Sequence, residues 1–407
     1  MADPADALIV GGGLNGPALA LALAGAGLSA AVIDAQPPRA RAGAGFDGRA
    51  YALSAASQRL LAAVGVWDAL APAAQPILRV LAADGRAGEG VARFFLHFDA
   101  AETEDGPMGY MVEDRHLYAA LCDGMERAGV RHLQAATVVA QEAGEALATV
   151  TLADGRWLQG RAILGCDGRD SGTGRRAGIG RTVRGYGQRA VVCAIDHDRP
   201  HGSVAQQVFL PTGPLALLPL TGNRSSVVWS ETGANAETLL VADDASFTAL
   251  LAERVGGALG GFRLAGRRFG YPLSLSLAER YVAHRVALAG DAAHGVHPVA
   301  GQGLNLGFRD VGALAEVMVT AARRGEDIGA ADVLARYERW RRPEATAMAL
   351  GMDAMTRLFS SDNAALRAAR VAGMGLVSAL PALRRTFIRT ASGLTGEVPQ
   401  LLRGLRP

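Results

Sequence analysis

The stretch ALIVGGGLNGPALALALAGAGLSAAVID, residues 7–34, decides the fold of this chain. Its first four residues have the apolar character of a short buried strand, and a glycine-rich turn follows them. An Ala/Leu-rich helix pattern then covers 17–26, and a second apolar strand pattern covers 30–33. The order strand, turn, helix, strand predicts a βαβ unit, the building block of a parallel sheet.

Three glycines in this turn, Gly11, Gly13 and Gly16, have the spacing G-x-G-x-x-G, and Asp34 follows 23 residues after the first of them. In a βαβ unit such glycines permit a tight turn, the close approach of a pyrophosphate and close packing of helix on strand. The carboxylate stands where a ribose hydroxyl is bound. The pattern therefore predicts a dinucleotide site, and it does not separate FAD from NAD.

A second motif, GDAAHGVHPVAGQGLNLG at residues 290–307, follows the apolar run 286–289 and opens an amphipathic helix. Gly301 and Gly303 bring backbone N–H groups to the start of that helix, where a partial positive charge collects. Such a helix start favours an electron-rich group. Together with the glycine turn, this motif indicates a bound flavin rather than a freely exchanging nucleotide.

Composition limits the class of protein and its partners. A chain of 407 residues is long enough for two or three packed units. Its 41 basic and 39 acidic residues give a net charge of +2, which provides no electrostatic basis for nucleic-acid binding. The three cysteines form no C-x-x-C pair, as is typical of a reducing compartment, and the N-terminus does not have the pattern of an export signal. We therefore expect a cytoplasmic protein.

A membrane contact stays open at the C-terminus. No apolar run reaches the ~20 residues that a membrane-spanning helix requires. The apolar segment 371–383 contains Pro381 and is flanked by arginines on both sides, as in a helix that lies in a membrane interface. A C-terminal packing helix with a solvated basic face fits the same residues equally well. Peripheral contact on the inner face of the membrane is therefore the alternative to a purely cytoplasmic location.

Two arginines lie near the starts of predicted helices. Residues 46–57 are expected to form a loop that leads into a helix with Ser54 as its N-cap, and Arg49 lies near the start of the loop. Arg115 opens a second helix pattern that ends at Arg127. Arg49 is placed to contact a pyrophosphate. For either arginine, the alternative is a solvated cation at a helix start.

Residues 131–166 are predicted to be successive strands, and the last of them runs into Asp167-Gly168. This pair presents a carboxylate at a sheet edge, although Asp-Gly alone indicates only a turn. From 185 to 280, short β-rich runs and one helix replace the earlier pattern. This change predicts an inserted domain.

After Leu304 the chain is predicted to be helical, with breaks at Pro343 and Pro381. The predicted fold class is α/β: a Rossmann-like FAD-binding domain with an inserted β-rich substrate domain and a helical C-terminus. The expected limits are 1–75, 100–184 and 281–350 for the discontinuous FAD-binding domain, 76–99 and 185–280 for the substrate domain, and 351–407 for the C-terminal helical region.

With these elements in order, the chain resembles the single-component FAD-dependent aromatic hydroxylases, the family typified by para-hydroxybenzoate hydroxylase. The glycine fingerprint, Asp167-Gly168 and Gly290-Asp291 match the motifs of that family in the same order. The segments GDAAHGVHPVAGQGLNLGFRD, DGRAYALSAAS and EDRHLYAAL resemble its ubiquinone-biosynthesis branch, which hydroxylates polyprenylated phenols. The resemblance extends to about residue 350 and is weakest in the inserted domain and the C-terminal tail.

The resemblance implies roles for several side chains. Asp34 binds the adenosine ribose, at a position where the family more often has Glu. Arg49 and Arg115 hold the pyrophosphate or ribityl region. Asp167 lies beside the flavin and nicotinamide-binding surfaces, and Asp291 accepts hydrogen bonds from the ribityl or pyrophosphate end.

The segment 301–305 is implied to face the pyrimidine edge of the isoalloxazine, where reduced flavin carries negative charge. The complete expected cofactor-binding set is Gly11, Gly13, Gly16, Asp34, Arg49, Arg115, Asp167, Gly168, Gly290, Asp291, Pro298, Gly301, Gln302, Gly303, Leu304 and Asn305. No metal site is expected, because His294 and His297 have no evident third ligand.

The implied activity is an FAD-dependent monooxygenase that hydroxylates the aromatic ring of a polyprenylated phenol in ubiquinone biosynthesis. The reaction would use a flavin C4a-hydroperoxide under an apolar lid. The implied partners are this phenol, O2, and NAD(P)H as a transient reductant, because only one dinucleotide fingerprint is present. A biosynthetic complex and a homo-oligomer stay open. The catalytic base is not assigned; candidate side chains in or near the inserted domain are Tyr186, His201, Tyr271 and His284.

Three alternative functions stay open. One is a flavoenzyme of the same fold with another reaction: an isoprenoid reductase or a halogenase, which would form no hydroxylated product, or another aromatic hydroxylase. A nicotinamide dehydrogenase would bind NAD reversibly and would leave the motif at 290–307 unexplained. A non-catalytic flavin-binding partner in a biosynthetic complex would be yellow and inactive. Fold similarity alone does not define the substrate.

Overall fold

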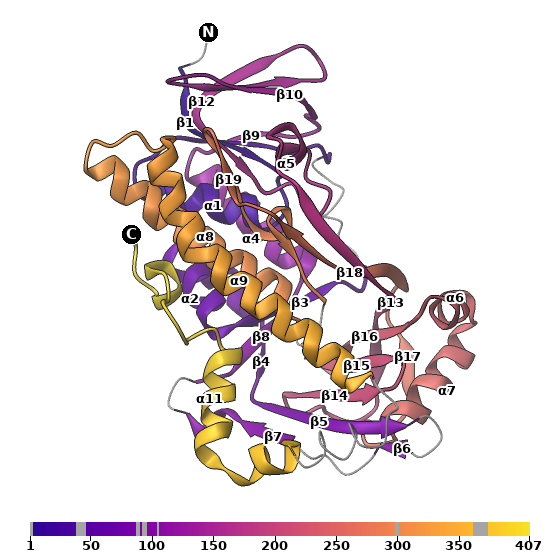
Figure 1. Ribbon diagram of the computed structural model, residues 1–407. Helices are drawn as coiled ribbons and strands as arrows, with labels where there is room; N and C mark the ends of the chain where they lie inside the picture. Colours follow the sequence, from indigo (N-terminus) through magenta and orange to yellow (C-terminus); the bar gives the residue numbers. More distant parts are fainter. Residues whose placement is uncertain are drawn as a thin grey trace.

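The structure is a computed structural model, shown in Figure 1, and it describes residues 3–37, 46–86, 90–91, 96–103, 106–297, 301–360 and 373–407. Two sheets lie at different ends of the molecule, and two long helices, α8 (Gln302–Arg323) and α9 (Ala331–Phe359), run side by side between them. Pro298, which belongs to the expected cofactor-binding set, lies outside the described residues.

The first sheet contains the predicted βαβ unit. Its strands are β1 (Ala5–Val10), β2 (Ala30–Ile33), β9 (Arg131–Leu133), β10 (Val138–Ala143), β11 (Ala148–Leu152), β12 (Trp157–Gly165), β19 (Val282–Ala283) and β20 (Val286–Leu288). Strands β20, β12, β1, β2 and β9 are parallel neighbours in that order, and β10 and β11 extend β12 as an antiparallel pair. All of β2 is buried, as expected for a parallel strand that is covered on both faces.

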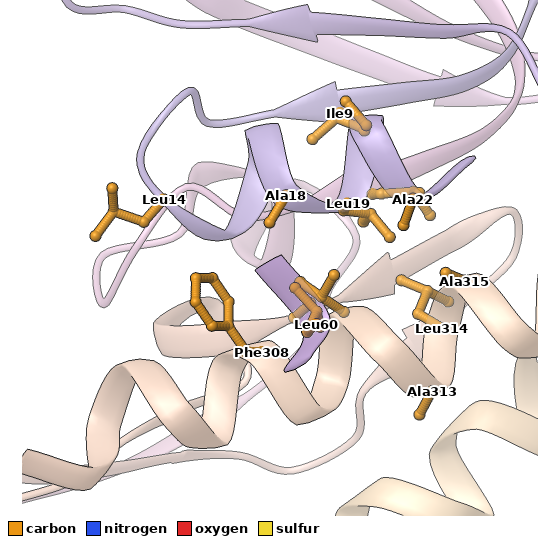
Figure 2. Close-up of a cluster of buried hydrophobic side chains, with 14 of the residues drawn as sticks. Ile9, Leu14, Ala18, Leu19, Ala22, Leu60, Phe308, Ala313, Leu314 and Ala315 are labelled. Carbon is orange, nitrogen blue, oxygen red and sulfur yellow. The ribbon is translucent and has the colours of Figure 1, made fainter. Parts of the chain in front are cut away.

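Helices pack against this sheet and form the main core. Figure 2 shows α1 (Asn15–Ala24) between β1, which carries Ile9, and α8, which carries Phe308 and Leu314. Leu19 of α1 is fully buried in the same cluster, and α4 (Asp114–Arg127) also contacts α1. Burial of one such leucine contributes about 2 kcal/mol. This core holds the glycine turn before α1 close to the beginning of α8.

The second sheet is larger and combines distant parts of the chain. Its strands are β5 (Arg79–Arg86), β6 (Gly90–Val91), β7 (Leu96–Asp99), β13 (Arg181–His197), β14 (Val204–Leu210), β15 (Gly213–Leu220), β16 (Arg224–Thr232), β17 (Phe262–Leu264), β18 (Phe269–Ala278) and β21 (His294–Gly295). The main path is β21, β18, β13, β16, β15, β14, β5, β6, with β17 paired to β13 and β7 paired to β5. Because β5 pairs in parallel with β14, segments before residue 100 and after residue 180 complete one sheet.

A small sheet and several short helices connect the two halves. The small sheet contains β3 (Ala50–Ser54), β8 (Gly109–Glu113) and β4 (Gln75–Ile77). The helices are α2 (Ala55–Ala63), α3 (Trp67–Leu70), α5 (Gly172–Arg176), α6 (Gly233–Val241), α7 (Asp244–Val255) and α11 (Pro381–Ala391), and residues 373–379 are also helical. Single 3-10 turns are η1 (Ala71–Ala73), η2 (Ala100–Glu102), η3 (Gly290–Ala292) and η5 (Gln400–Arg403).

The predicted α/β class with a Rossmann-like unit and a helical C-terminus is confirmed. Ser54 caps α2 as predicted, because its hydroxyl accepts a hydrogen bond from the Ser57 N–H. The expected loop before it is wrong in part, since residues 50–54 pair with β8 as strand β3.

The predicted helix break at Pro343 is also wrong, because Pro343 lies inside α9. Proline removes one backbone hydrogen bond from a helix, but α9 packs along α8 and reaches the second sheet at β15. These contacts keep the helix continuous. Pro381, in contrast, is the first residue of α11. Proline suits this position because the first N–H of a helix has no partner within the helix. Among the described helices, none combines the length and the apolar character needed to cross a bilayer.

Candidate functional site

The carboxyl ends of four parallel strands meet at one edge of the first sheet. Val10 of β1 pairs with Gly165 of β12 and with Ile33 of β2. Gly165 pairs in turn with Leu288 of β20. In open α/β sheets, ligands bind outside such an edge. The residues that follow these strand ends, and that the structure therefore brings together, are Gly11, Asp34, Asp167 and Gly290.

The glycine turn is packed so tightly that side chains cannot be added. Gly11 has a φ of +112°, and a Cβ there would overlap the carbonyl oxygen of Cys166. A Cβ on Gly16 would overlap the carbonyl oxygen of Gly11, and one on Gly12 would overlap the carboxylate of Asp34. The turn therefore presents bare backbone at the start of α1. Such a surface suits the close approach of a pyrophosphate.

Asn15 connects the two glycine motifs. A Cβ on Gly290, whose φ is +64°, would overlap the Asn15 amide nitrogen, and a Cβ on Gly307 would lie 2.6 Å from both amide atoms. Within the described residues, the Asn15 Oδ1 is buried and has no hydrogen-bond partner. A buried acceptor of this kind requires a donor. The cradle at this sheet edge therefore fits a ligand that carries hydroxyl groups.

Asp34 and Asp167 differ in how their carboxylates are used. Asp34 is buried and accepts a hydrogen bond of 3.0 Å from the backbone N–H of Gln36. Asp167 accepts hydrogen bonds from the Ser171 hydroxyl at 2.5 Å and from the Thr173 backbone N–H at 2.8 Å. The Asp167 carboxylate thus stabilises the first turn of α5, next to the glycine turn.

Two arginines hold the turn that contains Asp291. The Asp291 carboxylate forms an ion pair of 3.1 Å with Arg169, which also donates to the Val296 carbonyl oxygen at 3.0 Å. Arg181 donates to the Asp291 carbonyl oxygen at 2.8 Å and to that of Ala292 at 2.6 Å. The Asp291 side chain is partly exposed, so its carboxylate is still accessible to a ligand.

A buried charged cluster lies behind the same turn. Asp310 of α8 accepts hydrogen bonds from the Gly290 N–H at 3.0 Å, from His294 at 2.5 Å and from Arg341 of α9 at 2.9 Å. All three side chains are buried. Burial alone would raise the pKa of Asp310, but its electrostatic interactions with His294 and Arg341 and its hydrogen bonds from His294 and the Gly290 N–H hold this pKa below its usual value. The ionised carboxylate anchors the Gly290 turn.

The start of α8 is attached to β3 and α2 through Asn305. Gly301 caps α8 in the left-handed conformation, with a φ of +65°. The Asn305 amide oxygen accepts from the Ser54 N–H and the Ser57 hydroxyl, both at 2.8 Å, and its NH2 donates to the Ala52 carbonyl oxygen at 2.9 Å. The side chain of Asn305 therefore binds protein groups. What this helix start offers a ligand is backbone N–H groups.

Comparison with known proteins agrees with this geometry. The family described as "FAD binding domain" matches residues 4–350. The chain belongs to the FAD-binding domain family. This result confirms the predicted family and the predicted FAD cofactor.

The relatives of this FAD-binding domain protein cover nearly its whole length. A ubiquinone hydroxylase of Rhodospirillum rubrum is 47% identical in an alignment 410 positions long, which covers 98% of this chain and 93% of that protein. The 3-demethoxyubiquinol 3-hydroxylase of Escherichia coli is 36% identical, over 96% of this chain and 99% of the relative. The crystal structure of p-nitrophenol 4-monooxygenase from Pseudomonas putida has a TM-score of 0.81 and covers 98% of this chain and 100% of its own; at 20% identity it shows the shared fold alone.

Arg49 and Arg115 of the FAD-binding domain are both ion-paired. Arg49 contacts Asp47 at 2.6 Å and Asp114 at 3.3 Å, and Arg115 contacts Glu113 at 2.6 Å. Arg49 immediately precedes β3, and Arg115 lies in the first turn of α4. Since β8 leads directly into α4 and pairs with β3, these two elements lie together. The structure thus places both arginines in one region of the FAD-binding domain.

Three of the four candidate bases are placed away from the strand-end cradle or are already bound. The ring nitrogens of His201 accept from the Ser203 N–H and donate to the Leu220 carbonyl oxygen. Tyr271 is exposed on β18. His284 contacts the Gly144 carbonyl oxygen at 2.9 Å.

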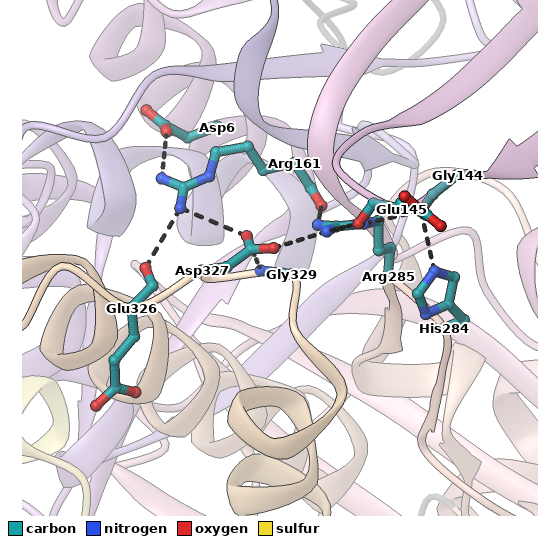
Figure 3. Close-up of polar contacts among 9 residues, drawn as sticks. All are labelled: Asp6, Gly144, Glu145, Arg161, His284, Arg285, Glu326, Asp327 and Gly329. Carbon is teal, nitrogen blue, oxygen red and sulfur yellow. Dashed lines mark hydrogen bonds and ion pairs between the residues drawn. The ribbon is translucent and has the colours of Figure 1, made fainter.

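Figure 3 shows where His284 lies in the fold. It belongs to a polar network that joins Arg161 of β12, Asp327 and Arg285, and Asp6 of β1. Asp6 lies near the start of β1 and Arg285 immediately precedes β20. The network is therefore at the amino ends of the parallel strands, and the cradle is at their carboxyl ends.

Tyr186, the fourth candidate, contacts the segment that leads to α8. Its ring meets the His297 ring edge to face with centroids 5.0 Å apart, and it shares a side-chain hydrogen bond with Asp353 of α9. His297 is buried and its Nε2 lies 3.3 Å from the Gln188 Oε1. Burial and the bond to Asp353 both raise the pKa of Tyr186, so its hydroxyl keeps its proton at neutral pH. The Tyr186 hydroxyl is therefore a hydrogen-bond donor to Asp353 in this structure.

Several residues that build the site had no role in the sequence prediction. Gly12 and Asn15 lie within the glycine fingerprint, and Asp310 ends the motif GDAAHGVHPVAGQGLNLGFRD, so their positions were visible in quoted motifs. Arg169 and Arg341 belong to no motif. Only the folded structure shows that they hold the turns around residue 290.

Proposed function

We propose that this chain is an FAD-dependent monooxygenase that hydroxylates the aromatic ring of a polyprenylated phenol in ubiquinone biosynthesis. The observation that carries the proposal is the cradle of bare backbone where four parallel strands end, between the glycine turn and the start of α8. The 47% identity to a ubiquinone hydroxylase over nearly the full length supports the choice of substrate class.

We propose the following division of the cofactor site. Gly11, Gly13, Gly16 and Asp34 hold the ADP half. Arg49 and Arg115 hold the pyrophosphate or ribityl region, and Asp167 and Gly168 lie beside the flavin and nicotinamide-binding surfaces. Gly290 and Asp291 meet the ribityl or pyrophosphate end, and Gly301, Gln302, Gly303, Leu304 and Asn305 meet the pyrimidine edge of the isoalloxazine. The tight contacts of Gly11 and Gly16 support the first group, and the partly exposed carboxylate of Asp291 supports its assigned contact. The contribution of Asn305 is its backbone, because its amide is bound to β3 and α2.

When bound, FAD supplies the redox chemistry that activates O2, and NAD(P)H serves as its transient reductant. The protein binds the cofactor and the substrate, orients them and shields them from water. The N–H groups in the first turn of α8 have no partners within the helix, so they stabilise negative charge at the pyrimidine edge. Asp310 fixes the Gly290 turn, and Asn305 fixes the start of α8, so these donors are oriented before a substrate arrives.

The second sheet is the proposed substrate domain. We assign 76–99 and 185–280 to it, 1–75, 100–184 and 281–350 to the FAD-binding domain, and 351–407 to a C-terminal helical region. The pairing of β5 with β14 supports joining the first two segments. Contact between Tyr186 of β13 and His297 supports a substrate space where this sheet meets the flavin segment. Water must be excluded from that space during oxygen transfer.

A cytoplasmic location with peripheral contact on the inner membrane face fits a substrate with a polyprenyl chain. A homo-oligomer or a biosynthetic complex is compatible with this location. These partners follow from the substrate class.

The proposal has a direct test. Purified protein should be yellow, should release FAD when denatured, and should oxidise NAD(P)H faster when a prenylated phenol is added, with one oxygen atom from O2 in the product. Colourless protein that cannot be reconstituted with FAD would exclude the proposal. Yellow protein that forms no hydroxylated product with any prenylated phenol would indicate another flavoprotein function. Asp291→Ala should lower flavin occupancy, and full occupancy at unchanged affinity would contradict its assigned contact.

A further inference from the structure

A buried histidine, His297, lies where the segment that leads to α8 leaves the second sheet. The two residues of β21 pair with β18, and His297 follows β21 by two positions. Its side chain is almost completely buried. Further along the chain, Gly301 begins the helix start that is proposed to meet the isoalloxazine. His297 therefore stands at the boundary between the proposed substrate domain and the proposed flavin site.

The neighbours of His297 determine which of its ring nitrogens carries the hydrogen. The Gln188 Nε2 donates a hydrogen bond of 2.6 Å to the Thr212 carbonyl oxygen, so the Gln188 Oε1 is the amide atom that faces His297. This oxygen can only accept, and it lies 3.3 Å from the His297 Nε2. Nε2 therefore carries the hydrogen and donates it. The Nδ1 of the same ring has a free lone pair.

The Nδ1 lone pair of His297 is buried and unused. Burial and the nearby charge of Arg169 lower the pKa of this imidazole to about 4, so the ring is neutral at physiological pH. Nothing in the part of the chain that the structure describes donates a hydrogen bond to Nδ1. The Tyr186 hydroxyl, whose ring packs against His297, is already bound to Asp353. Because a buried acceptor without a donor is unfavourable, Nδ1 fits a group that enters the protein with a donor.

A row of apolar side chains lies on the same face of the second sheet as Gln188. Val192 of β13 pairs with Val228 of β16, which pairs with Ala216 of β15. We call these three residues the apolar row. All three are only partly buried, whereas the alternate residues of their strands are buried in the cluster under α6 and α7. Gln188 and Val192 lie four residues apart in one strand, so they share a face.

The apolar row faces the FAD-binding half of the molecule. Strand β15 contacts α9, β4 and β8, and these elements lie on the face of the row because α6 and α7 cover the other face. The row and the His297 ring are thus neighbours on the inner side of the sheet, joined by Gln188. An aromatic ring that reaches Nδ1 with a hydroxyl group has an apolar surface beside it.

We propose that the Nδ1 of His297 accepts a hydrogen bond from the ring hydroxyl of the phenol substrate. The hydroxyl supplies the donor that Nδ1 lacks, and the apolar part of the substrate lies along the apolar row. This inference rests on the proposed function, which supplies the substrate class. It makes His297 a residue that determines specificity, because an analogue without the hydroxyl hydrogen leaves the buried lone pair unpaired.

Binding of two matched ligands to the oxidised, FAD-loaded, full-length protein tests the inference without turnover. ortho-Geranylphenol has the hydroxyl hydrogen, and ortho-geranylanisole has a methyl group in its place. Each is titrated in the absence of NAD(P)H, and the change in the flavin absorption spectrum gives the dissociation constant. Wild-type protein should bind the phenol about tenfold more tightly than the methyl ether, or tighter still.

Two substitutions of His297 distinguish its ring nitrogens. His297→Asn places an amide oxygen near the position of Nδ1, so this variant should keep most of the preference for the phenol. His297→Gln places its amide near the position of Nε2, so it keeps a contact with Gln188 but loses the acceptor, and the preference should fall to about twofold or less. His284→Gln is the control, because His284 lies in the network at the amino ends of the parallel strands. It should keep the wild-type preference.

Nitrogen NMR of protein with isotopically labelled histidine reads the same contact without any variant of altered affinity. The signals of His297 are those that disappear in His297→Gln. They should show a protonated Nε2 and an unprotonated Nδ1 in the free protein. The Nδ1 signal should shift when ortho-geranylphenol is added, and ortho-geranylanisole should leave it nearly unchanged. A protonated Nδ1 in the free protein would overturn the inference.

The outcomes separate this inference from the proposed function. Equal affinity of wild-type protein for the phenol and the methyl ether would overturn the inference even if the phenol is hydroxylated. An unchanged preference in His297→Gln would also overturn it and would assign the Nδ1 lone pair to an internal water. Binding with the expected preference, but without hydroxylation when NAD(P)H and O2 are added, would contradict the proposed function and leave the hydrogen bond assigned.

Discussion

The backbone N–H of Gly290 donates a hydrogen bond of 3.0 Å to the carboxylate of Asp310, which lies 20 residues later in α8. The same carboxylate binds Arg341 of α9, so a single buried charge joins a turn and two long helices. Gly290 itself is in the left-handed conformation and cannot carry a side chain because Asn15 occupies the space. Asp310 is fully buried, and it affects the shape of the proposed ribityl site through the Gly290 turn that it holds.

Asp310→Asn should destabilise the protein and reduce its flavin content. The substitution removes the fully buried one of the two carboxylates that pair with the fully buried Arg341; the other, Glu344, is partly exposed. Breaking a buried ion pair from one side costs about 3–5 kcal/mol. We expect a loss of this size in the free energy of unfolding, measured with urea, and a lower ratio of FAD to protein after purification.

A surface ion pair provides the matched control for this substitution. Asp332 lies 3.2 Å from Arg336 on α9, and its side chain is 73% exposed. Asp332→Asn should change the free energy of unfolding by less than about 1 kcal/mol, because exposed pairs contribute little. If Asp310→Asn were as mild as this control, the cluster would not be the support of the Gly290 turn.

Gly16→Ala should abolish FAD binding, and Gly351→Ala should not. A Cβ on Gly16 overlaps the Gly11 carbonyl oxygen, so the turn must open where the pyrophosphate is proposed to lie. Gly351 lies inside α9 with nothing within 4 Å of an added Cβ. Alanine there should stabilise the protein by about 0.5–1 kcal/mol through helix propensity. FAD affinity, measured by flavin fluorescence, and the melting temperature would both be read for each variant. A Gly16→Ala protein with normal FAD affinity would refute the assigned turn.

These glycines show why part of the site is visible in the sequence. The fingerprint around Gly11 and Gly16 is local, because strand, turn and helix follow one another within residues 7–34. Sequence spacing therefore suffices to predict it. The neighbours of Asn15 cannot be predicted in this way. Gly290 and Gly307 are brought to it by the packing of α1 against α8.

Charged partners were invisible in the sequence for a similar reason. Arg341 lies 31 residues after Asp310, and they meet only because α9 packs along α8. Asn305 was expected to face the flavin from its place in the motif, yet its amide binds Ala52 and Ser54. Motif spacing identifies the segment that forms the site. It does not show which atoms of that segment are already bound within the protein.

Stability should depend on pH through His297. Burial, together with the nearby positive charge of Arg169, lowers the pKa of this imidazole to about 4 in the folded protein, from 6.5 in the free side chain; Asp353 opposes the shift. The unfolded chain therefore binds a proton below pH 6.5 that the folded protein does not bind until about pH 4. Stability from this group is complete above pH 6.5 and is lost as the pH falls toward 4, by at most about 1.4 kcal/mol per pH unit.

His297→Gln removes this titration and should flatten the profile. The free energy of unfolding would be measured with urea at several pH values between 4 and 7, for wild type and variant. The difference between the two proteins should shrink or reverse toward the acidic end. His97→Gln is the control, because the His97 side chain is 54% exposed and lies on β7. Parallel profiles for wild type and His297→Gln would show that the buried imidazole does not determine the acid stability.

Arg285→Ala should lower stability without weakening FAD binding. Arg285 is buried and has a φ of +53°, and its guanidinium binds Asp327 at 2.6 Å and the Arg161 carbonyl oxygen at 3.0 Å (Figure 3). Loss of these charged hydrogen bonds leaves buried carbonyl groups without a donor, which costs about 1–3 kcal/mol. The network lies at the amino ends of β1 and β20, however, and the proposed flavin site lies at their carboxyl ends. The midpoint of urea unfolding should therefore fall. The dissociation constant for FAD, measured at a urea concentration where the variant is still folded, should stay within about twofold of wild type. His284→Gln in the same network should likewise keep the wild-type hydroxylation rate. A large loss of FAD affinity in Arg285→Ala, or of turnover in His284→Gln, would mean that the two edges of the sheet are coupled and that the cofactor site is not confined to the strand ends.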